Sequence, residues 1–206
     1  RSEPLHTCIA RDKARDRVVG EGVIRDMHTR YIKGRKLDHP TYEEKTEDPN
    51  GFFDFDSVPN YVAPEGGRET ILFDIDGTLA NHIGVRHPHD TSKYREDTCH
   101  EDVASMARAL HRAGYNIEIL SGRHKDFQED LEWWLEAYKI PHSRITMRER
   151  GGVKDDVEKL FLFEKHYRND PTVAVVAVFD DRNRVVQNTW RRALGIRCYH
   201  VAEGDF

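Results

Sequence analysis

The 206-residue sequence is poor in cysteine. Cys8, Cys99 and Cys198 are its three cysteines, and none of them forms the Cys-x-x-Cys spacing of a zinc site or a redox motif. An odd number of widely separated cysteines argues against a disulfide framework and indicates reduced thiols in a cytoplasmic compartment. The sequence also lacks any apolar run close to the roughly 20 residues that a membrane-spanning helix needs. We therefore expect a cytoplasmic protein with no membrane partner.

An excess of positive charge is missing as well. The 32 Lys and Arg residues are outnumbered by 37 Asp and Glu, giving a formal net charge of -5. A nucleic acid partner would therefore have to be held by a local groove rather than by a general positive field. The sequence begins Arg1-Ser2-Glu3-Pro4, with neither an initiator Met nor a signal peptide, so we interpret it as a fragment of a longer protein.

The composition changes twice along the chain. Residues 1–36 are basic, and their apolar residues Val23, Ile24, Met27 and Tyr31 recur at helical spacing. Residues 37–67 are acidic and proline-rich, which is typical of a linker, with four aromatic residues expected to pin part of it to a core: Phe52, Phe53, Phe55 and Tyr61. From residue 68 to residue 206, short apolar runs alternate with amphipathic helical patterns. This alternation predicts an α/β domain with a doubly wound parallel sheet of Rossmann-like type.

The most informative stretch runs from Ile71 to Leu79. Three apolar residues lead into Asp74-Ile75-Asp76-Gly77-Thr78, as at the carboxyl end of a buried parallel strand. Asp74 and Asp76 are two positions apart, so in strand geometry their carboxylates share one side and repel each other unless a cation or a proton intervenes. A calcium loop of the EF-hand type is excluded by the spacing. A simple strand-to-turn exit and a non-catalytic metal loop stay open on this stretch alone.

The residues that follow are polar. Residues 80–97 are expected to form a surface flap, in which three histidines suit a solvated loop better than a transition-metal site: His82, His87 and His89. Thr98 and Glu101 have the spacing of a helix capping box. Further on, Trp133 and Trp134 are interpreted as core residues rather than as a base-stacking platform.

Polar residues also stand at three later strand or helix ends: Ser121 with Arg123, Asp155 with Lys159, and Asp180 with Asp181. Strand-borne groups of a parallel sheet meet at one edge, however distant they are in sequence. A carboxylate that attacks phosphorus must approach an anion, so Mg²⁺ is needed to offset the repulsion. A hydroxyl and a lysine can hold the phosphoryl oxygens as charge develops on them. Together the four pairs indicate phosphoryl transfer.

These four signals, in this order, resemble the haloacid dehalogenase superfamily of phosphotransferases. The resemblance implies that Asp74 is a nucleophile forming an aspartyl-phosphate, and that Asp76 protonates the leaving oxygen and then activates water. It places Ser121 in the second motif and Lys159 in the third. It also implies Mg²⁺ held by the Asp74 carboxylate, the Asp76 backbone carbonyl and Asp180. Asp181 would then act through water or orient Lys159.

A narrower resemblance covers residues 69–206. The stretches Ser121-Gly122-Arg123, Lys154 to Lys159 and Asp180-Asp181-Arg182 are similar to the phosphatase half of the bacteriophage polynucleotide kinase/3′-phosphatase family. This similarity implies that Arg123, the Asp155/Lys159 pair and a flap arginine assist the reaction, and Arg86 is the candidate in the flap. It implies 3′-phosphorylated DNA or RNA ends as substrates. Arg148 and Arg150 are available outside the pocket, unless they are solvated or paired with Glu149 and Asp155.

Residues 7–36 look like the tail of the kinase half of that family, so residues 1–36 are interpreted as the end of a missing P-loop kinase domain. The sequence contains no GxxxxGK[ST] loop, and kinase activity is therefore not expected of it. The resemblance leaves open a homo-oligomer of the full-length protein and a host cytoplasm, if the source is a phage.

The sequence leaves room for only a short flap after the first strand and for no insertion between Arg148 and Lys154. We therefore expect no large cap domain and an open active site. An open site suits a polymer end, and two other interpretations stay open: a small-molecule or nucleotide phosphatase, and a non-catalytic module that binds nucleic acid ends.

Overall fold

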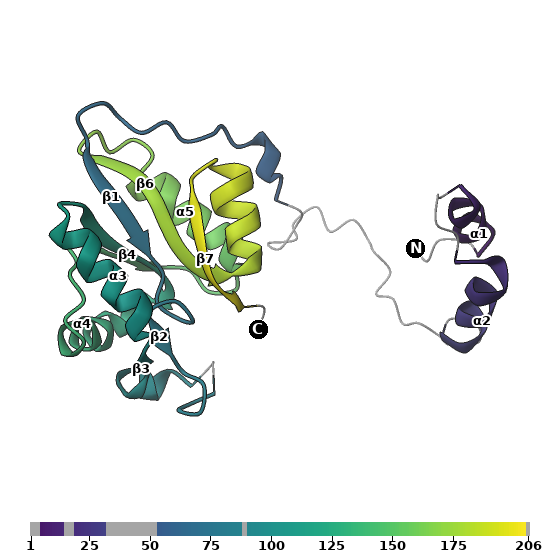
Figure 1. Cartoon of the computed structure of the whole chain (residues 1–206), viewed down its shortest axis with the longest axis horizontal. Helices are drawn as coiled ribbons and strands as arrows, with labels where there is room; N and C mark the ends of the chain where they lie inside the picture. The colour runs from purple at the N-terminus through teal and green to yellow at the C-terminus, as the bar shows by residue number, and fades with distance from the viewer. Residues whose placement is uncertain (1–4, 15–18, 32–52, 88–89, 205–206) are drawn as a thin grey trace. The chain divides into compact units, whose positions relative to one another are not determined.

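A computed structural model describes residues 5–14, 19–31, 53–87 and 90–204 (Figure 1). The chain divides into two compact units, Arg1–Asp48 and Pro49–Phe206. No helix within the described ranges is both long enough and apolar enough to cross a membrane. Phe52 and His89, which entered the sequence interpretation, lie outside the described residues, as does most of the linker over residues 37–67.

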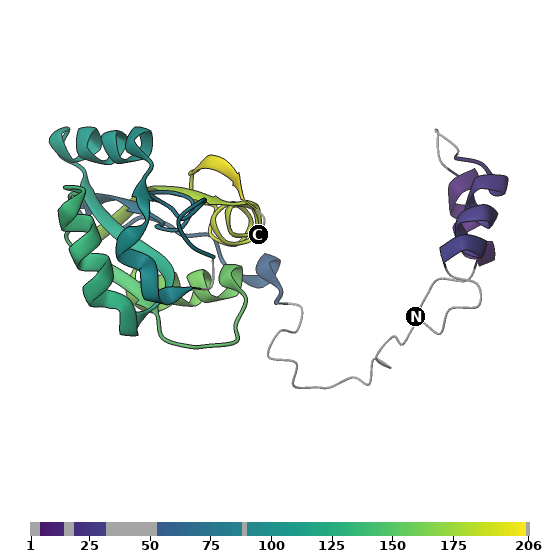
Figure 2. The same ribbon diagram turned by 90° about the horizontal axis from the view of Figure 1, so that it is seen from below.

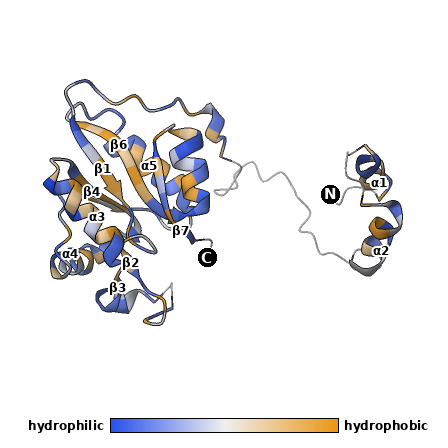
Figure 3. Ribbon diagram, in the orientation of Figure 1, coloured by the Kyte–Doolittle hydropathy of each residue, from blue (hydrophilic) through white to orange (hydrophobic). Residues whose placement is uncertain are grey.

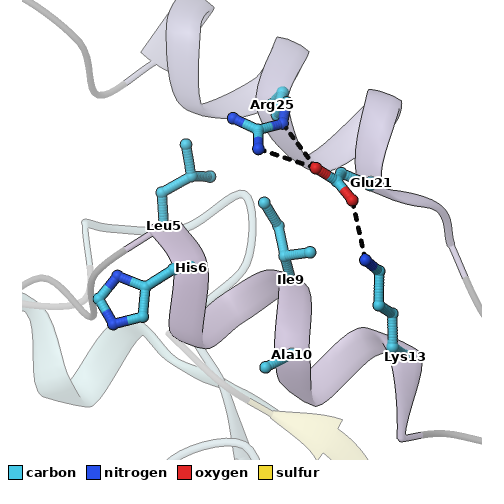
Figure 4. Close-up of a pocket in the computed structure, with 7 residues that line it drawn as sticks. All are labelled: Leu5, His6, Ile9, Ala10, Lys13, Glu21 and Arg25. Atoms are coloured by element: carbon cyan, nitrogen blue, oxygen red, sulfur yellow. Dashed lines mark hydrogen bonds and ion pairs between the residues drawn. The ribbon is translucent and has the colours of Figure 1, made fainter.

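The described part of the first unit contains two helices, α1 (Leu5–Lys13) and α2 (Glu21–Tyr31). The buried Asp12 carboxylate joins them, because it accepts hydrogen bonds from the backbone N–H groups of Val19 and Gly20, both at 2.9 Å. Figure 4 shows a pocket between the helices, where Glu21 contacts Lys13 at 3.0 Å and Arg25 at 2.8 Å. Helix α2 contains the residues of the predicted stripe, but Val23 and Met27 are exposed.

The second unit is built on a five-stranded sheet in the order β5-β4-β1-β6-β7, with every pair parallel. The strands are β1 (Arg68–Phe73), β4 (Asn116–His124), β5 (Ile145–Arg148), β6 (Val173–Arg182) and β7 (Cys198–Gly204). The short strands β2 (Ala80–Asn81) and β3 (Thr98–Cys99) form a separate antiparallel ribbon. The predicted doubly wound parallel sheet is confirmed.

Helices cover both faces of the sheet (Figures 1 and 2). One layer contains α3 (Glu101–Arg112) and α4 (Gln128–Ala137), and the other contains α5 (Asp155–His166) and the π-wound helix η4 (Val185–Ala193). Short 3-10 segments are also present among the described residues: η1 (Phe55–Ser57), η2 (Thr91–Glu96) and η3 (Lys125–Phe127). Because successive strand side chains point to opposite faces, Leu72 joins the α5 layer while Phe73 joins the α3 layer. Hydrophobic colour accordingly concentrates on the central strands (Figure 3).

Local structure departs from the sequence interpretation after β1. The predicted capping box is wrong, because Thr98 pairs with Asn81 in the β2–β3 ribbon and His100 precedes α3 without a side-chain cap. The flap is also more ordered than a plain loop, since it contains this ribbon and η2. Only one of the two tryptophans is a core residue: Trp134 is fully buried, whereas Trp133 is 47% exposed. Within the described part of this connection there is no cap domain.

Candidate active site

The site forms where β4, β1 and β6, the three middle strands, end side by side. Asp74 follows β1, Ser121 and Arg123 lie in the last part of β4, and Asp180 and Asp181 lie near the end of β6. The backbone N–H of Asp74 donates to the Phe179 carbonyl at 3.0 Å, which holds the end of β1 against β6. Lys159 approaches from the second turn of α5. The expected convergence at one sheet edge is present.

Lys159 bridges two of the carboxylates. Its Nζ lies 2.9 Å from Asp74 Oδ1 and 2.8 Å from Asp180 Oδ2, and all three side chains are buried. Burial would lower the pKa of the lysine, but Asp180 and Asp74 outweigh it and raise that pKa above its ordinary value. Lys159 is therefore a permanent cation beside the Asp74 carboxylate.

The single positive charge of Lys159 does not neutralise the three carboxylates of Asp74, Asp180 and Asp181, which we call the carboxylate cluster. The ligand oxygens of Asp74, Asp180 and Asp181 all lie within 4.8 Å of one another. Burial, together with the neighbouring carboxylates, raises the pKa of Asp74 despite the attraction of Lys159. Burial and the Asp180 charge likewise raise the pKa of Asp181 to about 6. A buried all-oxygen donor set with excess negative charge fits a hard divalent cation such as Mg²⁺.

The two neighbouring aspartates of β6 make different contacts. Asp180 Oδ2 accepts from Lys159 Nζ and also from Trp190 Nε1 at 2.9 Å, while its Oδ1 accepts from the backbone N–H of Arg182 at 3.1 Å. Asp181 Oδ1 accepts from the Thr78 hydroxyl at 3.1 Å. Lys159 is thus held by Asp180, whereas the resemblance implied that Asp181 would act through water or orient the lysine. Both carboxylate oxygens of Asp180 therefore accept hydrogen bonds, whereas Thr78 engages one oxygen of Asp181.

Gly77 explains how Asp181 fits beneath the loop after β1. The glycine has φ +82°, and a Cβ atom placed on it would lie 2.1 Å from Asp181 Oδ2. A side chain at this position would therefore displace the carboxylate and would also strain the backbone. Two residues of the Asp-Gly-Thr sequence thus position Asp181. Gly77 leaves space for its carboxylate, and the Thr78 hydroxyl donates a hydrogen bond to it.

Asp76 is held by two arginines. Arg123 donates from Nε to Asp76 Oδ2 at 2.9 Å and from Nη2 to Oδ1 at 2.8 Å. Arg86 donates from Nη2 to the same Oδ1 at 2.8 Å. Both guanidinium groups are buried, whereas the Asp76 side chain is 32% exposed. Burial would raise the pKa of Asp76, but Arg123 and Arg86 together bring it below its ordinary value. In this arrangement Asp76 is an ionised carboxylate that solvent can reach.

Asp97 is the site residue that sequence reasoning missed. Its fully buried carboxylate accepts from Arg86 Nε at 2.7 Å and from Arg123 Nη2 at 2.6 Å. Both arginines also lie over the Tyr94 ring, with Cζ-to-centroid distances of 4.6 Å and 4.0 Å. The Asp97 carbonyl accepts from Trp134 Nε1 at 2.8 Å, so α4 fixes its position. No residue periodicity marks Asp97, because its partners are distant in sequence.

Asp155 lies above the end of β4. A Cβ atom on Gly122 would lie 2.4 Å from Asp155 Oδ1, so the Ser121-Gly122-Arg123 turn and the start of α5 are in close contact. Arg148 Nη2 donates to Asp155 at 2.8 Å, and Lys159 Nζ lies 3.9 Å away. Ser121 is buried, and its hydroxyl accepts from the backbone N–H of Arg123 at 3.1 Å while keeping its own proton for donation.

The structure therefore brings all seven predicted catalytic residues into two adjoining groups. One group contains Asp74, Lys159, Asp155 and Ser121, and the other contains Asp76, Arg86 and Arg123. Arg150 lies elsewhere, because it pairs with Glu158 at 2.9 Å and covers the Phe161 ring. His82 is buried rather than solvated, contrary to the loop interpretation.

Comparisons with known proteins agree with this geometry. Residues 68–206 match the family described as the polynucleotide kinase PNKP phosphatase domain. A chain in the structure of the Pnkp1/Rnl/Hen1 RNA repair complex is 25% identical, with a TM-score of 0.65, over 99% of this chain and 64% of that chain. A second structure of the Pnkp1/Rnl/Hen1 complex gives 25% identity and a TM-score of 0.66, over 98% of this chain and 77% of the other. This chain thus spans less than two thirds of the first relative's length.

Proposed function

This chain belongs to the family of polynucleotide kinase PNKP phosphatase domains, and we propose that it removes the 3′-phosphate from a nucleic acid end. The observation that carries the proposal is the pairing of two aspartates two positions apart. Asp74 lies against Lys159 within a carboxylate cluster, while Asp76 is held as a carboxylate by Arg86 and Arg123. These different surroundings support Asp74 as the nucleophile and Asp76 as the general acid and base.

The proposed reaction has two steps. An oxygen of Asp74 attacks phosphorus, an acyl-phosphate bond forms, and the bond from phosphorus to the 3′-oxygen of the strand breaks. Asp76 gives its proton to that oxygen, so a 3′-hydroxyl leaves. Water then attacks the same phosphorus, Asp76 takes the proton of the water, and inorganic phosphate leaves while the Asp74 carboxylate is regenerated.

Asp76 needs a proton for the first step and none for the second. As long as both arginines hold it, it stays ionised and is suited to the base role. A phosphate group that enters beside Arg86 and Arg123 offers them another anion. Each hydrogen bond that moves from Asp76 to the phosphate raises the pKa of Asp76, which favours its protonated form. The shared arginines can thus couple substrate binding to the acid role.

The other residues hold the phosphoryl group. The Lys159 ammonium and the Ser121 hydroxyl stabilise the oxygens on which negative charge develops. Mg²⁺, held by the Asp74 and Asp181 carboxylates and the Asp76 backbone carbonyl, would supply charge that offsets the repulsion between nucleophile and phosphate. Asp180 positions Lys159, and Asp155 is held beside it by Arg148.

The substrate class is inferred from relatives and from architecture. The relatives belong to an RNA repair complex, which favours a role in repairing RNA ends, with a 2′,3′-cyclic phosphate as a further substrate. The described residues include no cap domain over the sheet edge, and this supports a polymer end rather than an enclosed metabolite. We also propose that residues 1–36 are the end of a kinase domain and that residues 37–67 are the linker after it.

A comparison of three substrates tests the proposal. A 3′-phosphorylated oligonucleotide, the same strand phosphorylated at its 5′ end and a phosphorylated sugar are supplied with Mg²⁺, and release of inorganic phosphate is measured. We expect the 3′-phosphorylated strand to be preferred by at least tenfold. Equal rates on all three would leave a generalist phosphatase. Binding of the strand without any release of phosphate would leave an end-binding module.

A further inference from the structure

A cavity lies at the start of α5. Its volume is about 350 Å³, and the residues of interest in its lining are Phe53, Lys154, Asp156, Arg184, Asn188 and Arg192. We call it the α5 pocket. The mechanism uses none of these side chains.

The α5 pocket and the active site share two segments of chain. Lys154 immediately precedes Asp155, whose carboxylate lies 3.9 Å from the catalytic Lys159. Arg184 follows shortly after Arg182, which donates from Nη1 to the same Asp155 at 3.3 Å. A strand whose terminal phosphate reached Asp74 would therefore pass close to this pocket as it leaves the site.

The pocket is positively charged although the whole chain carries -5. Three cationic side chains line it, against the single carboxylate of Asp156. That carboxylate is buried and already accepts from Asn188 Nδ2 at 2.8 Å and from the backbone N–H of Val157 at 3.0 Å. Arg192 is paired with Asp56. The exposed side chains of Lys154 and Arg184 also line the pocket.

An aromatic surface accompanies this charge. Phe53 is partly buried, and it contacts Phe55 and Phe161 edge to face, with centroid distances of 5.0 Å and 6.0 Å. Phe161 is itself 41% exposed. Cationic side chains beside an accessible aromatic ring are the combination that binds single-stranded nucleic acid, through phosphates and stacked bases.

We propose that the α5 pocket binds the nucleotide that precedes the terminal one in the substrate strand. Its phosphodiester group contacts Lys154 and Arg184, and its base packs against Phe53. This assignment rests on the proposed 3′-phosphatase function, and it explains how a site that holds a single phosphoryl group selects a polymer.

The test compares a 3′-phosphorylated oligonucleotide with a nucleoside 3′-phosphate, which has no preceding nucleotide. We expect the wild-type protein to favour the oligonucleotide in kcat/KM. The double substitution Lys154→Gln/Arg184→Gln should reduce this preference at least tenfold, mainly through KM, and Phe53→Leu should reduce it severalfold. The slope of log KM against log salt should flatten by about 0.7 for each backbone phosphate that the variant no longer neutralises. Arg112→Gln removes an exposed charge from α3, on the opposite face of the sheet, and should leave the preference unchanged.

An unchanged preference in the double variant would overturn the assignment while leaving the 3′-phosphatase function intact. If instead the wild-type protein does not discriminate 3′- from 5′-phosphorylated strands, the proposed function fails, and fluorescence anisotropy with a 3′-hydroxyl oligonucleotide still tests the pocket. Weaker binding by the double variant than by Arg112→Gln would support strand binding at the α5 pocket. Equal affinities would contradict it.

Discussion

Asp97 lies 2.6 Å from Arg123, and both side chains are fully buried. Through this contact and the one to Arg86, a flap residue outside the family's catalytic motifs fixes the two arginines that hold Asp76. The arrangement makes Asp97 a positioning residue.

Asp97→Asn should therefore reduce both stability and turnover. Removing one partner of a buried ion pair costs about 3 to 5 kcal/mol, because the remaining charges stay buried and under-compensated. We expect a fall of that size in the free energy of unfolding and at least a tenfold loss in kcat. The Mg²⁺ concentration for half-maximal activity should not change, since Asp97 is outside the carboxylate cluster. Asp102→Asn, at an exposed position in α3, is the control. A wild-type kcat in Asp97→Asn would rule out the positioning role.

Asp180 and Asp181 should differ in their response to metal. Asp181→Asn should raise the Mg²⁺ requirement at least tenfold, whereas Asp180→Asn should mainly disturb Lys159 and lower kcat. The pKa of Asp181 is raised to about 6 by burial, so its ionised form destabilises the metal-free fold above that pH. Asp181→Asn should therefore melt at a higher temperature than the wild-type protein in EDTA at pH 7.5.

Mg²⁺ should in turn stabilise the wild-type protein more than Asp181→Asn, since a ligand that binds only the folded state raises its stability. Thermal melts with and without metal measure both effects. If Asp180→Asn raised the Mg²⁺ requirement more than Asp181→Asn did, the roles inferred from the contacts would be exchanged.

Gly77→Ala should inactivate the protein, because the added Cβ would lie 2.1 Å from Asp181 Oδ2. The alanine would also have to adopt φ +82°, which strains its backbone. Gly84→Ala is a matched control, since Gly84 has φ +78° and no described atom within 4 Å of the added Cβ. Both variants should lose about 1 to 2 kcal/mol to backbone strain. Only Gly77→Ala should lose phosphatase activity by more than tenfold. Equal activities in the two variants would show that the proximity of Gly77 to Asp181 is unimportant.

The three thiols should react at very different rates. Burial raises the pKa of Cys99 to about 11 and that of Cys198 to about 12, so little of the reactive thiolate is present at pH 8. Cys8 is exposed in α1. Titration of the native protein with a thiol reagent at pH 8 should show one fast group, which Cys8→Ser abolishes. Two or three fast groups would contradict the burial of the other thiols.

The sheet and its carboxyl edge could be predicted because their signals are local. Apolar runs ending in Asp74 or Asp180 identify buried strands, and parallel strands must end on the same side. The different contacts of Asp180 and Asp181 could not be predicted in this way. Neighbouring residues on a strand point to opposite faces of the sheet, and the sequence does not tell which groups lie on each face. Asp97 was missed as a site residue for a related reason, since its importance depends on Arg86, Arg123 and Trp134, which only the tertiary fold brings near it.

The central claim, that Asp74 accepts the phosphoryl group, is tested most directly by trapping it. The protein is mixed in excess with an oligonucleotide carrying a radioactive 3′-phosphate and Mg²⁺, and the reaction is quenched in acid within milliseconds. We predict label on the protein that hydroxylamine releases, as expected of an acyl-phosphate, together with its absence in Asp74→Asn. Inorganic phosphate formed at the full rate with no label on the protein at any time, or by Asp74→Asn itself, would contradict the account.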